Sequence, residues 1–228
     1  MNTNLFRSAF AITISASSML ACKLLSPSSP ALSTVPSAGN EPALVTDDFS
    51  NPDNGWETEN TSDDSIQYAN GGLRIKAWSS EYFIWSDFGS QSYKDIHIEA
   101  TVKDESVDNS HSFGLMCDQQ GKATAHYFFA LDPTGYYEIG KRVVGKDDVI
   151  LTNNGQWAAS DLIKKTASSY RLGADCGHGI LAFYVDGKKI DSVSDTTYAD
   201  GIVALFLWSV KESTGPVTFV DFVMTSLK

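Results

Sequence analysis

Tryptophan and tyrosine side chains that stand beside polar residues are the clearest candidates for ligand chemistry in this sequence. The chain holds five Trp and nine Tyr, and they are densest in segment 78–85, WSSEYFIW. A flat aromatic ring suits the C–H face of a sugar, while neighbouring carboxylates, amides and amines can bind its hydroxyls. The alternative is that these rings fill a protein core, because aromatic side chains dominate all-β interiors. The candidates for ligand binding are Trp78, Tyr82, Trp85, Tyr137, Lys141 and Trp208.

The acidic residues do not form a pattern that indicates a glycoside-hydrolysing site. Such enzymes use two carboxylates roughly 5–10 Å apart. The pairs Asp104-Glu105 and Asp147-Asp148 are adjacent residues at turns, so their side chains diverge. The four histidines have no metal-ligand spacing, and the chain has neither a nucleophile elbow nor a phosphate-binding loop. We therefore predict no catalytic residue and no metal ligand, although carboxylates distant in sequence could still meet in space.

Calcium is an open alternative, although we expect no cofactor. A group of aspartates early in the domain could supply the oxygen ligands that calcium takes. A solvated acidic loop is the simpler explanation of the same residues. They are Asp47, Asp48, Asp53, Asp63 and Asp64.

The excess of acidic residues argues against two classes of partner. The chain carries a formal net charge of −11, whereas nucleic acids favour proteins with clusters of Lys and Arg. Anionic lipid surfaces also attract basic segments. We therefore expect no nucleic-acid partner, and attachment to a membrane would rest on a lipid anchor rather than on charge.

The first 21 residues have the features of a secretory signal peptide. They carry one charge, Arg7, followed by an apolar and small-residue run over 9–21 that is too short for a span of about 20 apolar residues. Met19-Leu20-Ala21-Cys22 resembles a bacterial lipobox, in which the cysteine is acylated and becomes the new N-terminus. An ordinary signal peptide and an uncleaved anchor are the alternatives. We expect a protein lipid-anchored at Cys22 in the cell envelope, facing outside the cytoplasm.

Lipidation of Cys22 would leave Cys117 and Cys176 as one pair of cysteines. Export places them in a compartment where disulfides persist. A bridge would close a loop of about 60 residues and contribute roughly 3–4 kcal/mol to the stability of the folded state. Two buried free thiols are the alternative.

The elements that must position these side chains are short strands. Residues 22–45 hold four of the seven prolines and predict a disordered spacer, and the domain occupies 46–228. Apolar residues alternate with polar ones in 73–78, 96–102 and 219–223, which is typical of half-buried strands. Asp186-Gly187 between two such runs predicts a hairpin with a type I′ turn. Only 158–165 could form a short helical turn. The pattern predicts an all-β, two-sheet antiparallel sandwich.

An ordered series of short motifs resembles the concanavalin A-like, LamG-like jelly-roll domains of exported bacterial proteins, including those near the 3-keto-disaccharide hydrolase group. The resemblance implies a jelly roll whose first and last strands are neighbours, and relatives often carry a cysteine at both Cys117 and Cys176. Many relatives have a basic residue where this chain has Asp118. The motifs are Asp48-Phe49-Ser50, Gly55-Trp56, Tyr68–Ile75, Phe113–Cys117, Tyr127–Leu131, Gly135–Ile139, Lys141, Arg171-Leu172, Leu181–Gly187, Asp195 and Gly201–Leu205.

These observations favour a membrane-anchored extracytoplasmic lipoprotein with a lectin-like, non-catalytic binding domain. Its partner would be a glycan or another protein of the envelope. A glycoside-active hydrolase resembling the 3-keto-disaccharide hydrolases is one alternative. A structural envelope protein, whose sandwich only packs against another protein, is a second.

Overall fold

The computed structural model describes residues 42–122, 124–143, 145–212 and 214–228. The expected signal peptide, Cys22 and nearly all of the expected spacer lie outside these residues. The first strand begins at Val45, one position before the predicted start of the domain. Within the described part of the chain, no helix is long and apolar enough to cross a membrane.

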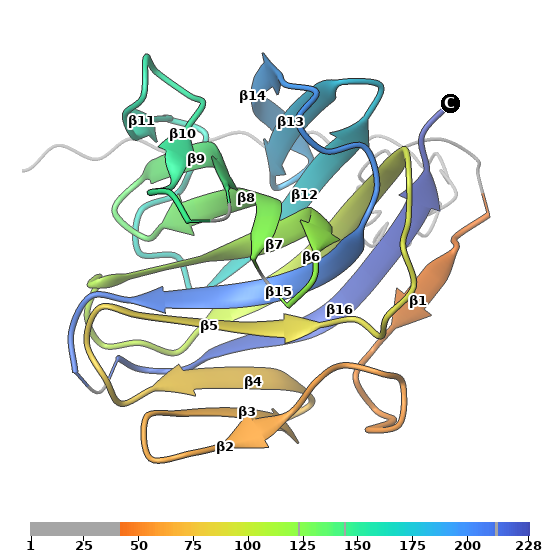
Figure 1. The fold of residues 1–228 in the computed structure, drawn as a ribbon. Coiled ribbons are helices and arrows are strands. Elements are labelled where there is room, and N and C mark those ends of the chain that lie inside the picture. Colours follow the sequence, from red (N-terminus) through yellow and green to blue (C-terminus); the bar gives the residue numbers. More distant parts are fainter. Residues whose placement is uncertain (1–41, 123, 144, 213) are drawn as a thin grey trace, which may run out of the picture. The chain divides into compact units, whose positions relative to one another are not determined.

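Two antiparallel sheets form the domain, and Figure 1 shows β5, β15 and β7 passing in front of β16 and β6. The larger sheet has nine strands, and its last strand β16 also pairs with the first, β1, as the family resemblance implies. Its order is β14 (Lys188–Ser194), β13 (Ile180–Val185), β12 (Ser169–Gly177), β6 (Ile96–Asp104), β16 (Val217–Ser226), β4 (Gly72–Ala77), β3 (Asp64–Ala69) and β2 (Glu59–Asn60), with β1 (Val45–Asp47) beside β16.

The smaller sheet has seven strands, and its late strand β15 lies between β7 and β5. The predicted helical turn at 158–165 is absent: this segment holds a two-residue strand and turns. The order is β10 (Val149–Ile150), β9 (Tyr136–Arg142), β8 (Ala125–Asp132), β7 (His111–Gln120), β15 (Ile202–Ser209) and β5 (Tyr82–Asp87), with β11 (Ala158–Ala159) also paired to β9.

Alternation along the strands places the core between the two sheets, because successive side chains point to opposite faces. In β6 the residues Ile96, Ile98, Ala100 and Val102 are buried in the main core. The facing strands of the smaller sheet contribute residues from the same alternate positions, including Phe113, Leu115 and Cys117 of β7. The all-β sandwich that the sequence predicts is therefore the observed fold.

A disulfide and a hairpin turn also match the sequence analysis. Cys117 of β7 and Cys176 of β12 are bonded, with their Cα atoms 6.5 Å apart, so the bridge joins one sheet to the other. Asp186 and Gly187 have φ values of 50° and 74°. Positive φ at both positions is what a type I′ turn requires.

Candidate functional site

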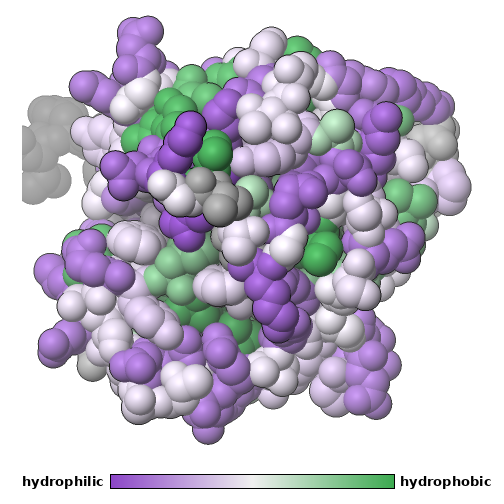
Figure 2. All heavy atoms as spheres, viewed as in Figure 1, coloured by the Kyte–Doolittle hydropathy of each residue, from purple (hydrophilic) through white to green (hydrophobic). Residues whose placement is uncertain are grey.

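The outer face of the smaller sheet carries an aromatic cluster that is separate from the main core. Met116, Phe128, Ala130, Ala204 and Phe206 are buried there. Phe83, Trp85 and Trp157 pack against them from the rim. Figure 2 shows hydrophobic atoms gathered in a hollow over this region, with hydrophilic atoms around it. Soluble domains seldom leave such a face open without a binding role.

Two glycines allow the large rings of this cluster to lie against the sheet. A Cβ atom at Gly140 would overlap the ring of Phe128. One at Gly114 would overlap the backbone carbonyl of Phe129 and would also come within 2.8 Å of a ring carbon of Phe206. Both glycines occupy outward-facing positions on strands β9 and β7. The absence of their side chains therefore shapes the floor of the hollow.

A pocket of about 180 Å³ opens on this floor. A cavity of about 150 Å³ is enough to hold a benzene molecule, so this pocket has room for one six-membered ring. Its walls are mostly aromatic, and they come from all the long strands of the sheet and from the segment between β10 and β11. The lining residues are Phe83, Ser112, His126, Phe128, Ala130, Glu138, Arg142, Asp148, Trp157, Phe206 and Trp208.

A second hollow continues the first along the same face. The two share Ser112, Trp157 and Trp208. The second hollow extends past Tyr136, whose side chain is exposed, towards Val210. Together they form one groove, which we call the aromatic groove, with two tryptophans at its midpoint.

Glu138 is a buried polar group that lines the aromatic groove. It is 9% exposed, and its Oε2 atom has no hydrogen-bond partner among the described residues. Burial, with a smaller contribution from the charge of Asp148, raises the pKa of Glu138 to about 7. At neutral pH its carboxyl group can therefore donate as well as accept a hydrogen bond.

Arg142 and Asp148 form a fixed ion pair beside Glu138. The Nε and Nη2 atoms of Arg142 donate to the two carboxylate oxygens of Asp148, both at 2.8 Å. The guanidinium group lies 5.0 Å from the centre of the Phe83 ring, over its face. On the same outer face of the smaller sheet, the imidazole of His126 lies parallel to the Phe83 ring, with ring centres 6.1 Å apart. The groove thus combines apolar platforms with a few polar groups held in place, as ligand sites commonly do.

Two of the sequence-predicted candidates lie on this face. Trp208 lines both parts of the groove, and Trp85 stacks against Phe83 with ring centres 5.7 Å apart. The predicted alternation in 82–85 is confirmed, because Phe83 and Trp85 face outward while Tyr82 and Ile84 pack against the main core.

The other candidates lie elsewhere. Tyr137 is 6% exposed and packs in the main core, where its hydroxyl donates to Asp191. Lys141 donates to the carboxylate of Asp195 and to the hydroxyl of Thr197. Trp78 follows β4 and carries the ammonium of Lys76 over its ring at 5.4 Å. The structure does not bring these residues into the groove.

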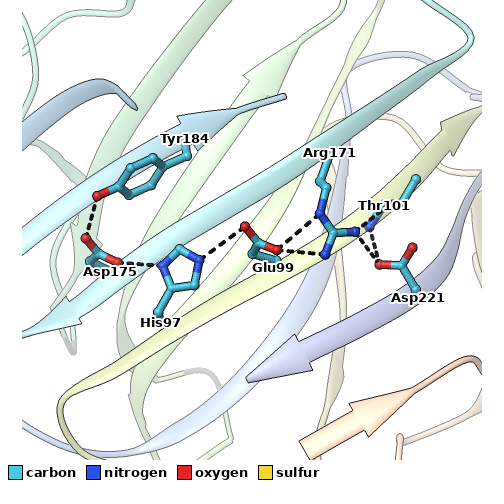
Figure 3. A network of polar contacts seen from close by, with 7 residues as sticks. All are labelled: His97, Glu99, Thr101, Arg171, Asp175, Tyr184 and Asp221. Atoms are coloured by element: carbon cyan, nitrogen blue, oxygen red, sulfur yellow. Dashed lines mark hydrogen bonds and ion pairs between the residues drawn. The ribbon is translucent and has the colours of Figure 1, made fainter. Parts of the chain in front are cut away.

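The outer face of the larger sheet is occupied by a chain of polar contacts, drawn in Figure 3. The Tyr184 hydroxyl donates to Asp175, which contacts Nδ1 of His97, and Nε2 of His97 lies 3.3 Å from Glu99. Arg171 then joins Glu99, at 2.7 Å, to the rest of the chain. Its Nη1 donates to Thr101 and Asp221, both at 2.8 Å.

These contacts determine which side chains are charged on the outer face of the larger sheet. Burial lowers the pKa of His97, but its hydrogen bonds to Asp175 and Glu99 outweigh that effect and raise the pKa to about 9. The bond from His97, together with Arg171, lowers the pKa of Glu99 to about 2. Each charged side chain in this series of contacts already has a partner of opposite charge. We therefore interpret the polar residues of this face as structural ion pairs.

Four of the five early aspartates accept hydrogen bonds in turns or in a buried contact. The carboxylate of Asp47 accepts hydrogen bonds from the backbone of Phe49 and from the indole of Trp56. Asp64 pairs with Thr61, and Asp63 accepts from Ser79. Among the described residues there is no group of three or more His, Cys, Asp or Glu side chains that could hold a metal ion.

Several groove residues were not predicted from the sequence, and only some of them have a position that the sequence pattern indicates. Glu138 alternates with the buried residues Tyr137 and Ile139 in β9, so the outward direction of its side chain could be predicted once the strand was identified. Trp157 lies outside the strands, and nothing in the sequence indicates that it reaches the sheet. The approach of Asp148 to Arg142 depends on β10 folding back on β9.

No protein-family model and no curated protein matches the sequence. Solved structures share the fold at low sequence identity. The carbohydrate-binding module CBM66 from Bacillus subtilis is 16% identical, with a TM-score of 0.59 over 75% of this chain and 96% of that chain. An endo-β-1,3-glucanase from Pyrococcus furiosus is 10% identical, with a TM-score of 0.58 over 82% and 94% of the two chains.

A third solved structure, a Bacillus subtilis protein of unknown function with a galectin-like fold, is 12% identical. Its TM-score is 0.59 over 82% of this chain and 97% of that chain. The domain therefore has the concanavalin A-like jelly-roll fold that the sequence resemblance implies, and solved structures of galectin-like fold share it.

Proposed function

We propose that the aromatic groove binds a glycan, and that it does so without catalysis. The observation that carries this proposal is the placement of Phe83, Trp157 and Trp208 around a carboxyl group with an open acceptor, Glu138, in a pocket with room for one ring. Sugar rings offer apolar faces to such aromatic platforms and hydroxyl groups to such a carboxyl. The fold supports the proposal as an analogy, because the similar structures include a carbohydrate-binding module and glucanases.

The test is binding of the purified protein to a mixed-glycan array, followed by titration of any positive glycan. We expect Trp208→Ala and Trp157→Ala to weaken binding at least about tenfold, equivalent to about 1.4 kcal/mol. Trp78→Ala is the matched control, because Trp78 lies outside the groove. Signals at background for every glycan, or equal losses in all three variants, would contradict the proposal.

Hydrolysis of glycosides is the second candidate function. One observation favours it: the pKa of Glu138, raised by burial to about 7, suits a general acid, and the carboxylate of Asp148 lies near enough to contribute to that shift. Against it, both oxygens of Asp148 are engaged by Arg142. Turnover on a panel of glycosides that is abolished in Glu138→Gln would promote this candidate over simple binding.

We also propose that the domain is displayed on the cell envelope through a lipid on Cys22. The lipobox-like sequence Met19-Leu20-Ala21-Cys22 supports this, as does the Pro- and Ser-rich composition of 22–45. The Cys117–Cys176 disulfide agrees with export to an oxidising compartment.

A further inference from the structure

Another pocket, of about 200 Å³, shares no residue with either part of the aromatic groove. We call it the acidic pocket, because Asp95, Asp118 and Asp195 line it. It lies where strands of both sheets end. Asp118 comes from the end of β7, Asp95 precedes β6, and the turn 177–180 joins β12 to β13. The segment 195–199, which follows β14, closes the remaining side.

Asp118 is the unusual residue of this pocket. It is only 3% exposed, yet its Oδ1 atom has no hydrogen-bond partner in the described part of the chain. Burial, followed by the charges of Asp200 and Asp95, raises the pKa of Asp118 to about 6. The group is therefore mostly ionised at pH 7.5, and a buried anion with an unfilled acceptor destabilises the protein unless something neutralises it.

Two of the cationic groups in or beside this pocket are engaged with other acids. Lys141 binds Asp195, and Nδ1 of His178 lies 3.4 Å from Asp95. Lys94 also lines the pocket, and the described residues hold no ion pair with it. Asp118 is thus left as the acceptor of this pocket that a ligand can fill.

Another part of the pocket wall is apolar or aromatic. Ile180, Leu181 and Ala199 contribute aliphatic surface. The rings of Tyr127 and Tyr198 contact each other edge to face, with centres 5.2 Å apart. A positive group bearing a short apolar body would therefore match both the acidic and the apolar parts of the wall.

We propose that this acidic pocket binds a protonated primary amine on a small apolar body, with Asp118 as its counter-ion. An ammonium group offers three donors and no acceptor, which suits a site whose unfilled polar atom is a carboxylate oxygen. An organic cation is favoured over a metal ion, because no group of three or more potential protein ligands converges among the described residues. This site is independent of glycan binding in the groove.

The test is a titration of the purified protein followed by two-dimensional amide NMR at pH 7.5 and constant ionic strength. The probes are n-butylammonium, its neutral counterpart 1-butanol, and calcium chloride. We expect saturable shifts of the Asp118 and Gly177–Ile180 amides with butylammonium, and at least about tenfold weaker binding of 1-butanol. Equal binding of the neutral probe, or shifts with calcium alone, would overturn the proposal.

Three variants and one control make the assignment specific. Asp118→Asn should abolish butylammonium binding, whereas Asp161→Asn, at an exposed turn, should leave it unchanged. Asp200→Asn should weaken binding severalfold, and Lys94→Met should strengthen it by removing a competing cation. If Asp118→Asn does not fold, the last two variants decide, and unchanged affinity in both would refute the role of Asp118.

Discussion

Glu138 faces outward from β9 and is nevertheless buried, because aromatic side chains surround it on the sheet surface. Its pKa of about 7 exceeds that of an ordinary glutamate, 4.5. A carboxyl group with a raised pKa in the folded state contributes stability that is fully present below pH 4.5 and is lost as the pH rises through 7.

The stability of the Glu138→Gln variant relative to the wild type should therefore increase as the pH rises. We expect the variant to gain stability relative to the wild type between pH 4.5 and pH 8, by up to about 3 kcal/mol. Urea unfolding at the two pH values measures this difference. Glu212→Gln, at an exposed position, is the control, and a pH-independent difference for Glu138→Gln would show that its pKa is ordinary.

On the outer face of the larger sheet, the fold stabilises the charged form of His97, whereas burial stabilises the neutral form of Glu138. A histidine whose pKa is raised from 6.5 to about 9 contributes stability that is present below pH 6.5 and is lost as the pH rises through 9. His97→Gln should cost on the order of 2–3 kcal/mol at pH 6 and clearly less at pH 9.5. His178→Gln, at a half-exposed turn, should show little cost at either pH in the same unfolding experiment.

Among the elements, β9 couples the stability of the smaller sheet to the shape of the aromatic groove. Gly140→Ala would force the ring of Phe128 off the sheet. We expect a loss of about 1–3 kcal/mol in stability, as for overpacked cores, together with loss of glycan binding. Gly173→Ala on the larger sheet, where a Cβ would stay 3.3 Å or more from its neighbours, should retain binding; similar effects of both changes would contradict this role of Gly140.

The disulfide between β7 and β12 should contribute more to stability than any single contact in the groove. The bridge spans 59 residues of sequence, for which the chain-entropy estimate is roughly 4 kcal/mol. Replacing both Cys117 and Cys176 by Ala should lower the urea midpoint accordingly without changing the ligand preference of the groove. An unchanged midpoint would mean that the unfolded chain is already compact.

Strands were predictable from the sequence because their alternation is local, whereas the groove was not, because it depends on which strands become neighbours. The pattern in 82–85 correctly separated Phe83 and Trp85 from Tyr82 and Ile84. It did not reveal which outward face would gather aromatic residues. That outcome depends on β15 inserting between β5 and β7, which brings Trp208 beside Phe83.

For the whole molecule, the prediction that matters most concerns the proposed lipid anchor at Cys22. Intact mass of the protein extracted from membranes should match residues 22–228 plus acyl groups, and it should rise by two hydrogens on reduction. Cys22→Ser is the control, and it should yield a protein without the acyl mass. A wild-type protein without acyl groups would remove the proposed anchor and leave the groove unaffected.

The last two strands of the chain, β15 and β16, are each needed to complete one of the two sheets. β15 joins β5 to β7 in the smaller sheet, and β16 joins β4 and β1 to β6 in the larger one. While the chain after residue 201 has yet to emerge, the smaller sheet consists of two pieces and the larger sheet of three, with no shared edges between them. Under the export proposed above, partly translocated chains would present unpaired strand edges to chaperones and proteases. We therefore expect folding to follow completion of the chain, with truncation before β16 yielding a degraded product rather than a smaller working domain.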